Sequence, residues 1–329
     1  MDKDRRPRAN AMGSDADAAA SAHAPSPAEP ACGLVDCAII GAGPAGLTAA
    51  IYLQRFRRNI AIFDDGRSRA RWIPKSHNCP GFAHGISGPD LLDRLHDQSV
   101  AHGVAVQPVR IASIERRADE FVLSDVRGGT HRARTVLLAT GIVDVMPRVH
   151  GVREAIQCGA IRLCAICDAY EARDSSMACY GPIRLAAPHA RFLRSFSTSV
   201  LLVPSDDDTL DDSECESLAE IGIHCTARAQ QWHFDGRHCS VLCVDGTRHA
   251  VDVMYPVLGS HARSALATRL GARTDANGEL IVSVDQQTSV PGLYGIGDIV
   301  SALNQISVAV GHAAIAATAI HRVLPLNAR

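Results

Sequence analysis

The chain of 329 residues lacks the features that mark two common classes of protein. Its 33 Lys and Arg residues and 35 Asp and Glu residues nearly balance, with a net charge of −2. A nucleic-acid-binding protein needs a broad basic field, so no nucleic-acid partner is expected. The longest apolar run, residues 306–320, is interrupted by Gly311 and His312. It is too short to span a bilayer, so no membrane association is expected.

The 11 cysteines also lack the pattern of a disulfide scaffold or a zinc module. A secreted scaffold is shorter and denser in cysteine, so this usage predicts a reducing cytoplasm. A C-x-x-C pair at 164–167 has no second copy, and Cys158 and Cys179 lie at spacings unlike those of zinc sites. The His and Cys residues of 224–243 fit no common site either, so no bound metal is expected.

Residues 1–33 are rich in Ala, Asp, Pro and Ser and lack an apolar face. Such a segment cannot offset the entropy of ordering, so we predict a disordered tail. Arg5 and Arg6 suggest a twin-arginine export signal, but no apolar segment follows them. The sequence leaves open whether Met1 or Met12 is the true start.

A strand, a glycine turn and a helix follow the tail. Residues 35–40 form a short apolar run typical of a buried parallel strand, and residues 41–46 read Gly-Ala-Gly-Pro-Ala-Gly. Gly41 permits the tight turn, Gly43 permits close approach to a pyrophosphate, and Gly46 permits close packing of the helix on the strand. The spacing predicts a dinucleotide site, against the alternative of a plain tight turn.

A second strand over residues 60–63 supports this interpretation. It ends in Asp64, 18 residues after Gly46, where an acid binds a ribose hydroxyl. Further elements are expected in order along the chain: a turn at 78–82, a helix over 88–102, and strands over 104–109, 111–114, 121–123 and 135–141.

The chemistry of the chain is expected at Cys164 and Cys167. Two thiols at this spacing close a small disulfide ring and open it again, so that one attacks a partner and the other resolves the mixed disulfide. Asp168 follows directly and is placed to exchange a proton with a departing thiolate. A redox pair is the favoured interpretation, with a metal site or a structural pair as the alternatives.

Several of these segments together resemble the low-molecular-weight thioredoxin reductase family of flavoproteins, over residues 34–329. The matching segments are 41–46, 78–81, 139–141, 164–168 and 288–298, in the order of the family. The resemblance implies an α/β fold of three layers, with two Rossmann-like FAD/NAD(P)-binding domains, the second inserted in the first. We expect the FAD domain at 34–145 and 259–329, and the inserted domain at 146–258.

The resemblance implies FAD at the first site. Asp298 would contact the ribityl and phosphate end, and the helix from Ile306 would point its positive end at the isoalloxazine. From spacing alone, Asp298 is equally a helix cap. The expected cofactor-binding residues are Gly41, Gly43, Pro44, Ala45, Gly46, Asp64, Asn78, Ala139, Thr140, Gly141, Gly297, Asp298, Gln305 and Ile306.

The resemblance also implies roles for the cysteines. Cys167 would exchange electrons with FAD, Cys164 would meet the partner, and Asp168 would be the acid. The family usually has glycine next, where this chain has Ala169. The implied partner is a small dithiol or disulfide or a thioredoxin-like protein, and the implied assembly is a homodimer.

The second nucleotide site departs from the family, so use of NAD(P)H is doubtful. After a strand at 176–180, the turn keeps Gly181 but has Ile183 where the backbone should approach the pyrophosphate. Pro188 falls inside the next helix and is expected to kink it. The strand 200–203 leads into Asp206–Asp208, which repel a phosphate or, alternatively, form a solvated loop.

Relatives that lack the nucleotide site oxidise the dithiols of small natural products and return electrons to oxygen, and others take electrons from ferredoxin. His312 is a candidate base for such an oxidase, with packing as the alternative. The leading hypothesis is an FAD-dependent thiol–disulfide oxidoreductase without NADPH, either a dithiol oxidase or an atypical reductase. The alternatives are an NAD(P)H-dependent disulfide reductase and a flavoprotein redox sensor that does not turn over.

Overall fold

The computed structural model describes residues 33–300 and 303–326. The predicted tail lies outside these residues apart from Gly33, and with it the choice between Met1 and Met12.

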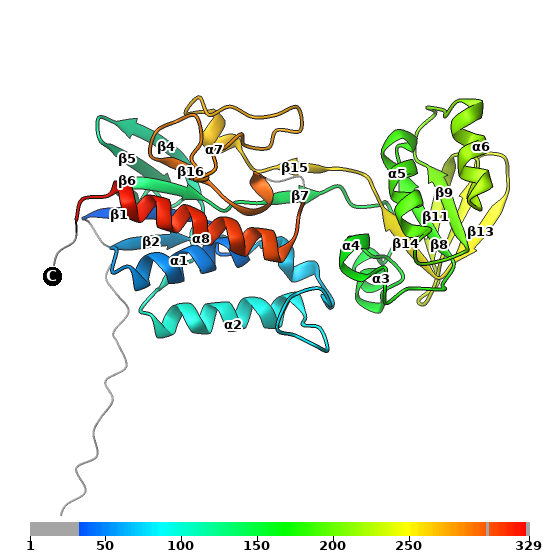
Figure 1. The fold of residues 1–329 in the computed structure, drawn as a ribbon, viewed down its shortest axis with the longest axis horizontal. Coiled ribbons are helices and arrows are strands. Elements are labelled where there is room, and N and C mark those ends of the chain that lie inside the picture. Colours follow the sequence, from blue (N-terminus) through cyan, green and yellow to red (C-terminus); the bar gives the residue numbers. More distant parts are fainter. Residues whose placement is uncertain (1–32, 301–302, 327–329) are drawn as a thin grey trace, which may run out of the picture. The chain divides into compact units, whose positions relative to one another are not determined.

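A seven-stranded mixed sheet forms the core of the first domain within the described chain (Figure 1). The strand order is β3-β2-β1-β6-β5-β4, and β16 also pairs with β6. Parallel pairing of β1 with β2 and β6 places Ile39 between Ile62 and Leu137, all fully buried. The strands are β1 (Leu34–Ile40), β2 (Ile60–Phe63), β3 (Val106–Gln107), β4 (Ile111–Arg117), β5 (Glu120–Asp125), β6 (Thr130–Leu138) and β16 (Leu293–Gly295).

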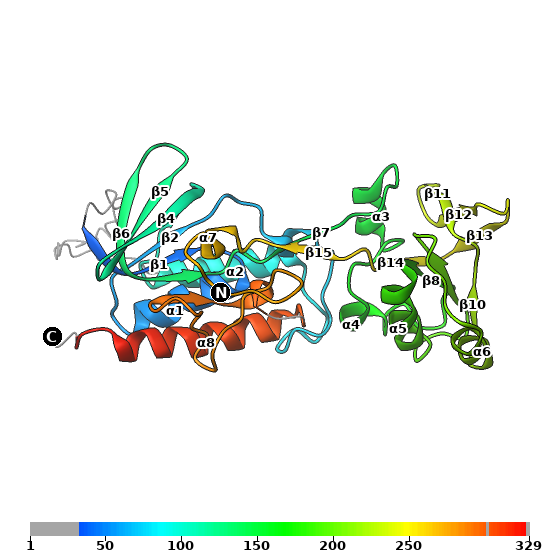
Figure 2. The ribbon, with the colours of Figure 1, turned by 90° about the horizontal axis from the view of Figure 1, so that it is seen from above.

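Helices from both ends of the chain pack together in this domain. Helices α1 (Pro44–Arg55) and α8 (Ile306–Val323) lie side by side in both views (Figures 1 and 2). Their small buried residues share one apolar cluster with β1. The remaining helices of the domain are α2 (Gly88–Ala101), α7 (Ala265–Thr268) and the short 3-10 turns η1 (Arg69–Trp72) and η2 (Gly297–Ile299).

Helix α8 is longer than the apolar run in the sequence suggested. It has 18 residues and, by length and composition alone, is apolar enough to cross a membrane. Its buried face consists mostly of alanines, such as Ala313 and Ala317, in the core cluster shared with α1. Of this helix, 28% of the 18-residue window is buried, and one such helix is weak evidence for a membrane span.

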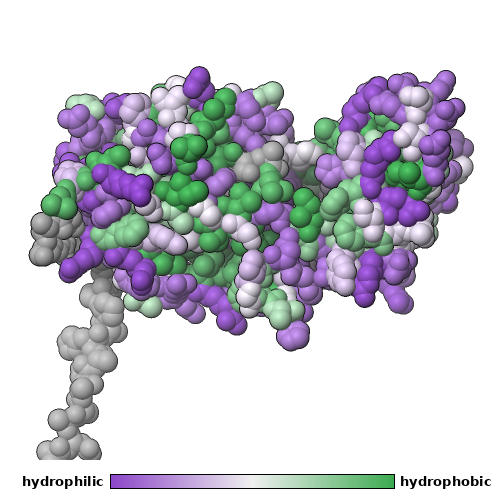
Figure 3. All heavy atoms as spheres, in the orientation of Figure 1, coloured by the Kyte–Doolittle hydropathy of each residue, from purple (hydrophilic) through white to green (hydrophobic). Residues whose placement is uncertain are grey.

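Figure 3 shows one face of the molecule, on which apolar side chains gather over the region of α1 and α8. Exposed apolar residues of these two helices include Tyr52, Val310, Ile315 and Val323. Helix α8 therefore exposes single apolar side chains besides the face that packs in the core.

The inserted segment forms its own parallel sheet, in the order β10-β9-β8-β14. A separate antiparallel sheet, β11-β12-β13, lies between β10 and β14 in the same segment of the chain. The strands of these two sheets are β8 (Met177–Gly181), β9 (Val200–Pro204), β10 (Ile223–Cys225), β11 (Ala229–Phe234), β12 (Cys239–Cys243), β13 (Arg248–Val251) and β14 (Val253–Pro256). Its helices are α3 (Val152–Cys158), α4 (Ala165–Asp168), α5 (Ile183–Leu193) and α6 (Asp212–Glu220).

Two short strands pair where the chain passes between the two segments. Strand β7 (Ile142–Asp144) is antiparallel to β15 (Ser260–Ala262), with His261 opposite Val143. This ladder lies at the joins expected near residues 145 and 259. The α/β fold with two Rossmann-like sheets agrees with the sequence prediction, while the exact domain boundaries stay a prediction.

One local prediction is corrected. The strand expected over 104–109 shrinks to β3 (Val106–Gln107), at the edge of the sheet. Pro108 follows at once, and proline cannot donate to a ladder. Pro188 lies inside α5, which runs from Ile183 to Leu193, as the sequence suggested. The kink expected at this proline stays a prediction.

Candidate active site

A cavity of about 640 Å³ brings most of the predicted site residues together. The predicted residues that line it are Gly41, Gly43, Pro44, Ala45, Asp64, Asn78, Ala139, Thr140, Gly141, Cys164, Cys167, Asp168, Gly297, Asp298, Gln305 and Ile306. The described lining does not include Gly46 or His312.

The glycine turn after β1 leaves no room for side chains. Gly41 has φ +104°, and a Cβ there would lie 2.3 Å from the carbonyl oxygen of Ala139. A Cβ on Gly46 would lie 1.8 Å from the carbonyl oxygen of Gly41. Gly46 therefore acts at the contact between helix and strand, and the turn itself borders the cavity.

Asp64 stabilises this turn through hydrogen bonds to two backbone amides. Its Oδ1 accepts a hydrogen bond from the Ala42 amide at 3.0 Å, and its Oδ2 accepts one from the Gly66 amide at 2.7 Å. The carboxylate still borders the cavity. The predicted ribose ligand thus also fixes the shape of the loop that carries it.

Two helices begin at the cavity without a capping side chain among the described residues. Helix α1 starts at Pro44 and α8 at Ile306, and neither has an acid in its first turn. Near the start of α8, Asn304 Oδ1 is buried and has no hydrogen-bond partner among the described residues. Uncapped amide groups and a positive helix end favour an anionic ligand.

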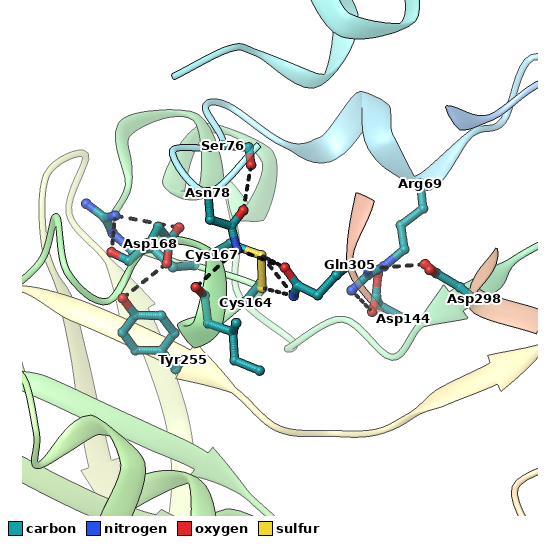
Figure 4. Close-up of a disulfide and its surroundings, with 12 residues drawn as sticks. Arg69, Ser76, Asn78, Asp144, Cys164, Cys167, Asp168, Tyr255, Asp298 and Gln305 are labelled. Carbon is teal, nitrogen blue, oxygen red and sulfur yellow. Dashed lines mark hydrogen bonds and ion pairs between the residues drawn. A yellow bond between two sulfur atoms is a disulfide. The ribbon is translucent and has the colours of Figure 1, made fainter. Parts of the chain in front are cut away.

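Arg69 joins two carboxylates from distant parts of the chain (Figure 4). Its guanidinium lies 2.6 and 2.9 Å from the Asp144 oxygens and 3.4 Å from Asp298 Oδ2. Burial raises the pKa of Asp298, and the charge of Arg69 opposes that rise. The predicted flavin ligand Asp298 is therefore held by an arginine that the sequence did not point to.

Cys164 and Cys167 form a disulfide, with their Cα atoms 5.3 Å apart. Gln305, which immediately precedes α8, donates from Nε2 to both sulfurs at 3.5 Å (Figure 4). Asn78 Nδ2 donates to Gln305 Oε1 at 2.8 Å and to the Ile166 carbonyl at 3.3 Å. Ser76 in turn donates to Asn78 Oδ1 at 3.1 Å. A chain of amide and hydroxyl groups thus ends on the redox pair.

Asp168 lies at the end of α4, beside the disulfide in the chain. Tyr255 donates to its Oδ1 at 3.3 Å, and Arg162 Nη1 lies 3.6 Å from its Oδ2. Burial raises the pKa of Asp168 to about 6, which the Arg162 charge and the Tyr255 hydrogen bond oppose. A carboxyl that titrates near neutral pH is suited to proton exchange.

His312 lies in the second turn of α8. Its Nδ1 is buried and has no hydrogen-bond partner among the described residues, and burial lowers the pKa of the ring. It therefore favours the neutral form at pH 7. Because the cavity lining on α8 ends at Ala309, its catalytic role stays a prediction without support from the cavity.

The second glycine turn is closed by the chain's own groups. The Ile183 amide, at the start of α5, donates to Asp206 Oδ1 at 3.1 Å, where a pyrophosphate oxygen would bind in a dinucleotide site. A Cβ on Gly181 would lie 2.1 Å from the Val257 carbonyl oxygen. The acidic loop is therefore built into this edge of the sheet.

The neighbouring acids are paired as well. Asp207 lies 2.6 Å from the Arg228 guanidinium. Asp208 lies 3.4 Å from Arg184, which also pairs with Glu214 at 3.0 Å. The side chains of Asp207 and Asp208 are still 89% and 53% exposed, so the loop is solvated, as the alternative expected, and is paired as well.

Sequence reasoning missed Arg69, Arg162 and Tyr255. Arg69 lies on the 3-10 turn η1, and the other two contact Asp168 from an irregular segment before α4 and from β14. The family motifs contain none of them. A buried carboxylate needs a hydrogen-bond donor or a cation beside it. This requirement predicts that Asp168 and Asp298 have such partners, but it does not say which residues supply them.

Comparison with known proteins agrees with this site. The pyridine nucleotide-disulphide oxidoreductase family profile matches residues 35–313. A thioredoxin reductase of Claviceps purpurea, tcpT, is 31% identical over 85% of this chain and 92% of its own.

Solved structures agree with this fold. HlmI has a TM-score of 0.82 at 25% identity, covering 88% of this chain and 92% of its own. The Streptococcus pyogenes thioredoxin reductase has a TM-score of 0.81 at 26% identity, covering 88% and 97%.

The fold and the disulfide beside a dinucleotide-type cavity define an FAD-dependent oxidoreductase that acts on disulfides. The chain belongs to the pyridine nucleotide-disulphide oxidoreductase family, and within it to the low-molecular-weight thioredoxin reductases. The glycine turn and the uncapped starts of α1 and α8 fit FAD. Bound there, FAD would supply a two-electron acceptor or donor for the cysteine pair.

Proposed function

We propose that this protein is a thiol–disulfide oxidoreductase that oxidises dithiols through Cys164 and Cys167 and works without NADPH. One observation carries the proposal: the Ile183 amide at the start of α5 is bound by the carboxylate of Asp206. A nucleotide pyrophosphate would need that amide. The Asp206 carboxylate would have to leave the Ile183 amide before a pyrophosphate could bind there.

The proposed reaction consists of two thiol–disulfide exchanges. A thiolate of the substrate attacks Cys164 Sγ, the S–S bond breaks, and Cys167 leaves as a thiolate. The second substrate thiol gives up a proton and attacks the substrate sulfur that is bound to Cys164. Cys164 then leaves as a thiolate. The substrate dithiol becomes a disulfide, the cysteine pair is reduced by two electrons, and two protons are released. Asp168 is the proposed acceptor for one of these protons.

FAD held at the glycine turn and Asp298 would supply the acceptor for this electron pair, and dioxygen is the proposed final oxidant, with hydrogen peroxide as its product. The proposed substrate is a small dithiol. The proposed compartment is the reducing cytoplasm, and the proposed assembly is a homodimer.

A second function is favoured by a different observation. The Claviceps purpurea and Streptococcus pyogenes relatives are named thioredoxin reductases. An NAD(P)H-dependent reductase of a thioredoxin-like protein is therefore the competing proposal. It requires the loop at Asp206 to open and Ile183 to tolerate a pyrophosphate.

An anaerobic titration of the flavoprotein separates these proposals. The flavin absorbance near ~450 nm is followed as NADPH, NADH or dithiothreitol is added separately. Bleaching by dithiothreitol alone, reversed by air with formation of peroxide, is the result expected of the oxidase. Rapid bleaching by NADPH would overturn the proposal in favour of the reductase. Bleaching by none of the three would favour a redox sensor or a ferredoxin-type donor.

A further inference from the structure

Tyr255 contacts the Asp168 carboxyl from a strand on which no catalytic group was expected. It lies on β14 and is 2% exposed. Its hydroxyl donates to Asp168 Oδ1 at 3.3 Å, across 87 positions of the sequence (Figure 4). Burial raises the pKa of Tyr255, so the phenol keeps its proton and can only donate to a carboxylate.

The other charged groups that face Asp168 come from the same inserted segment. Arg162 lies 3.6 Å from Oδ2, and its Nη1 also donates to the Asp168 carbonyl at 3.1 Å. Glu171 adds a repulsive charge and is itself 3.7 Å from His77 Nδ1. Compared with Arg162, Tyr255 makes the shorter contact with the Asp168 carboxyl oxygens.

We propose that Tyr255 is a positioning residue that fixes the Asp168 carboxyl through Oδ1 and leaves Oδ2 as the oxygen that exchanges protons with the cysteine pair. The inference rests on the role proposed above for Asp168. The Arg162 guanidinium lies 3.6 Å from Oδ2, a longer contact than the Tyr255 hydrogen bond to Oδ1. Its positive charge stabilises the carboxylate.

In this arrangement Tyr255 also sets the pH range in which Asp168 works. A donor that bonds to a carboxylate stabilises the charged form and lowers the pKa. Removing the phenolic hydroxyl therefore raises the pKa of Asp168 above its value of about 6. One lost hydrogen bond of this length corresponds to about a three- to tenfold change in proton affinity.

The test uses the holoenzyme with Tyr255→Phe, which keeps the ring in the core. Infrared difference spectra across pH follow the carbonyl band of the protonated Asp168 carboxyl, and Asp168→Asn identifies that band by its loss. We expect the band to persist to higher pH in Tyr255→Phe, with the three- to tenfold change in affinity. An unchanged titration would overturn the proposal.

The rate of flavin reduction by dithiothreitol gives a second readout. Below both pKa values the ratio of Tyr255→Phe to wild-type rates falls by about three- to tenfold, and above both it returns to one. The ratio cancels the ionisation of dithiothreitol itself. A ratio that is low and constant at all pH values would indicate a merely structural role and would overturn the proposal.

Tyr180→Phe is the matched control. Tyr180 lies on the neighbouring strand β8, but its ring packs on Trp232 at 5.3 Å between centroids, in a different apolar cluster from Tyr255. We expect its infrared titration and its rate ratio to match wild type. If dithiothreitol fails to reduce the flavin of the wild type, the proposed function fails; the infrared titration of Asp168 still decides the inference.

Discussion

Replacing Arg69 by methionine should destabilise the fold far more than the same change at Arg67. The Arg69 side chain is 25% exposed and pairs with Asp144 at 2.6 Å and Asp298 at 3.4 Å. Removing it leaves two partly buried carboxylates without their cation, which costs about 3–5 kcal/mol. Arg67, on the same loop, is 64% exposed and pairs with Asp65. Its loss should cost about 0–1 kcal/mol.

The assay is urea unfolding followed by circular dichroism, at a fixed saturating FAD concentration. The difference between the variants should depend on pH. Burial already raises the pKa of Asp298, and loss of the Arg69 charge raises it further. The penalty of Arg69→Met is then largest at neutral pH, where the carboxylates are charged. It shrinks as pH falls through the raised pKa, because the protonated acid needs no cation.

Equal destabilisation by Arg69→Met and Arg67→Met at neutral pH would refute this reasoning. A penalty of Arg69→Met that stays constant down to acidic pH would show that the arginine acts by packing of its stem and not by charge.

Three further predictions concern the redox site and the cofactor. Cys167→Ser should abolish bleaching of the flavin by dithiothreitol while the yellow cofactor stays bound, as checked by absorbance after gel filtration. Gln305→Leu removes two hydrogen bonds to the sulfurs and should slow that bleaching by about three- to tenfold in stopped flow; an unchanged rate would argue against this contact. Gly46→Ala places a Cβ 1.8 Å from the Gly41 carbonyl oxygen and should release FAD, measured by flavin fluorescence of the filtrate, whereas an intact flavin content would contradict the packing argument.

Much of the first domain could be predicted because local rules act there. The glycine turn needs small residues at fixed spacing, and an apolar run of the length of β1 (Leu34–Ile40) suits a buried parallel strand. The placement of Cys164 and Asp298 at one cavity also follows from motifs that a family shares.

The contacts that tune the site could not be predicted in this way. Tyr255 meets Asp168 because β14 pairs with β8, so their contact depends on the strand order of the whole sheet. Periodicity finds strands but does not pair them. Arg69 lies on the short 3-10 turn η1, and its partners Asp144 and Asp298 come from two later segments. Sequence shows the charges of the acidic loop without their partners, so the contacts of Asp206 and Asp208 could not be read from it.

The carboxylate of Asp206 gives the start of α5 a resident anion that cannot diffuse away. A tethered group acts at an effective concentration of millimolar or more, set by the short loop that carries it. A free phosphate in solution has to displace this carboxylate before it can accept a hydrogen bond from the Ile183 amide. Any anion at the start of α5 therefore competes with a group of the chain itself.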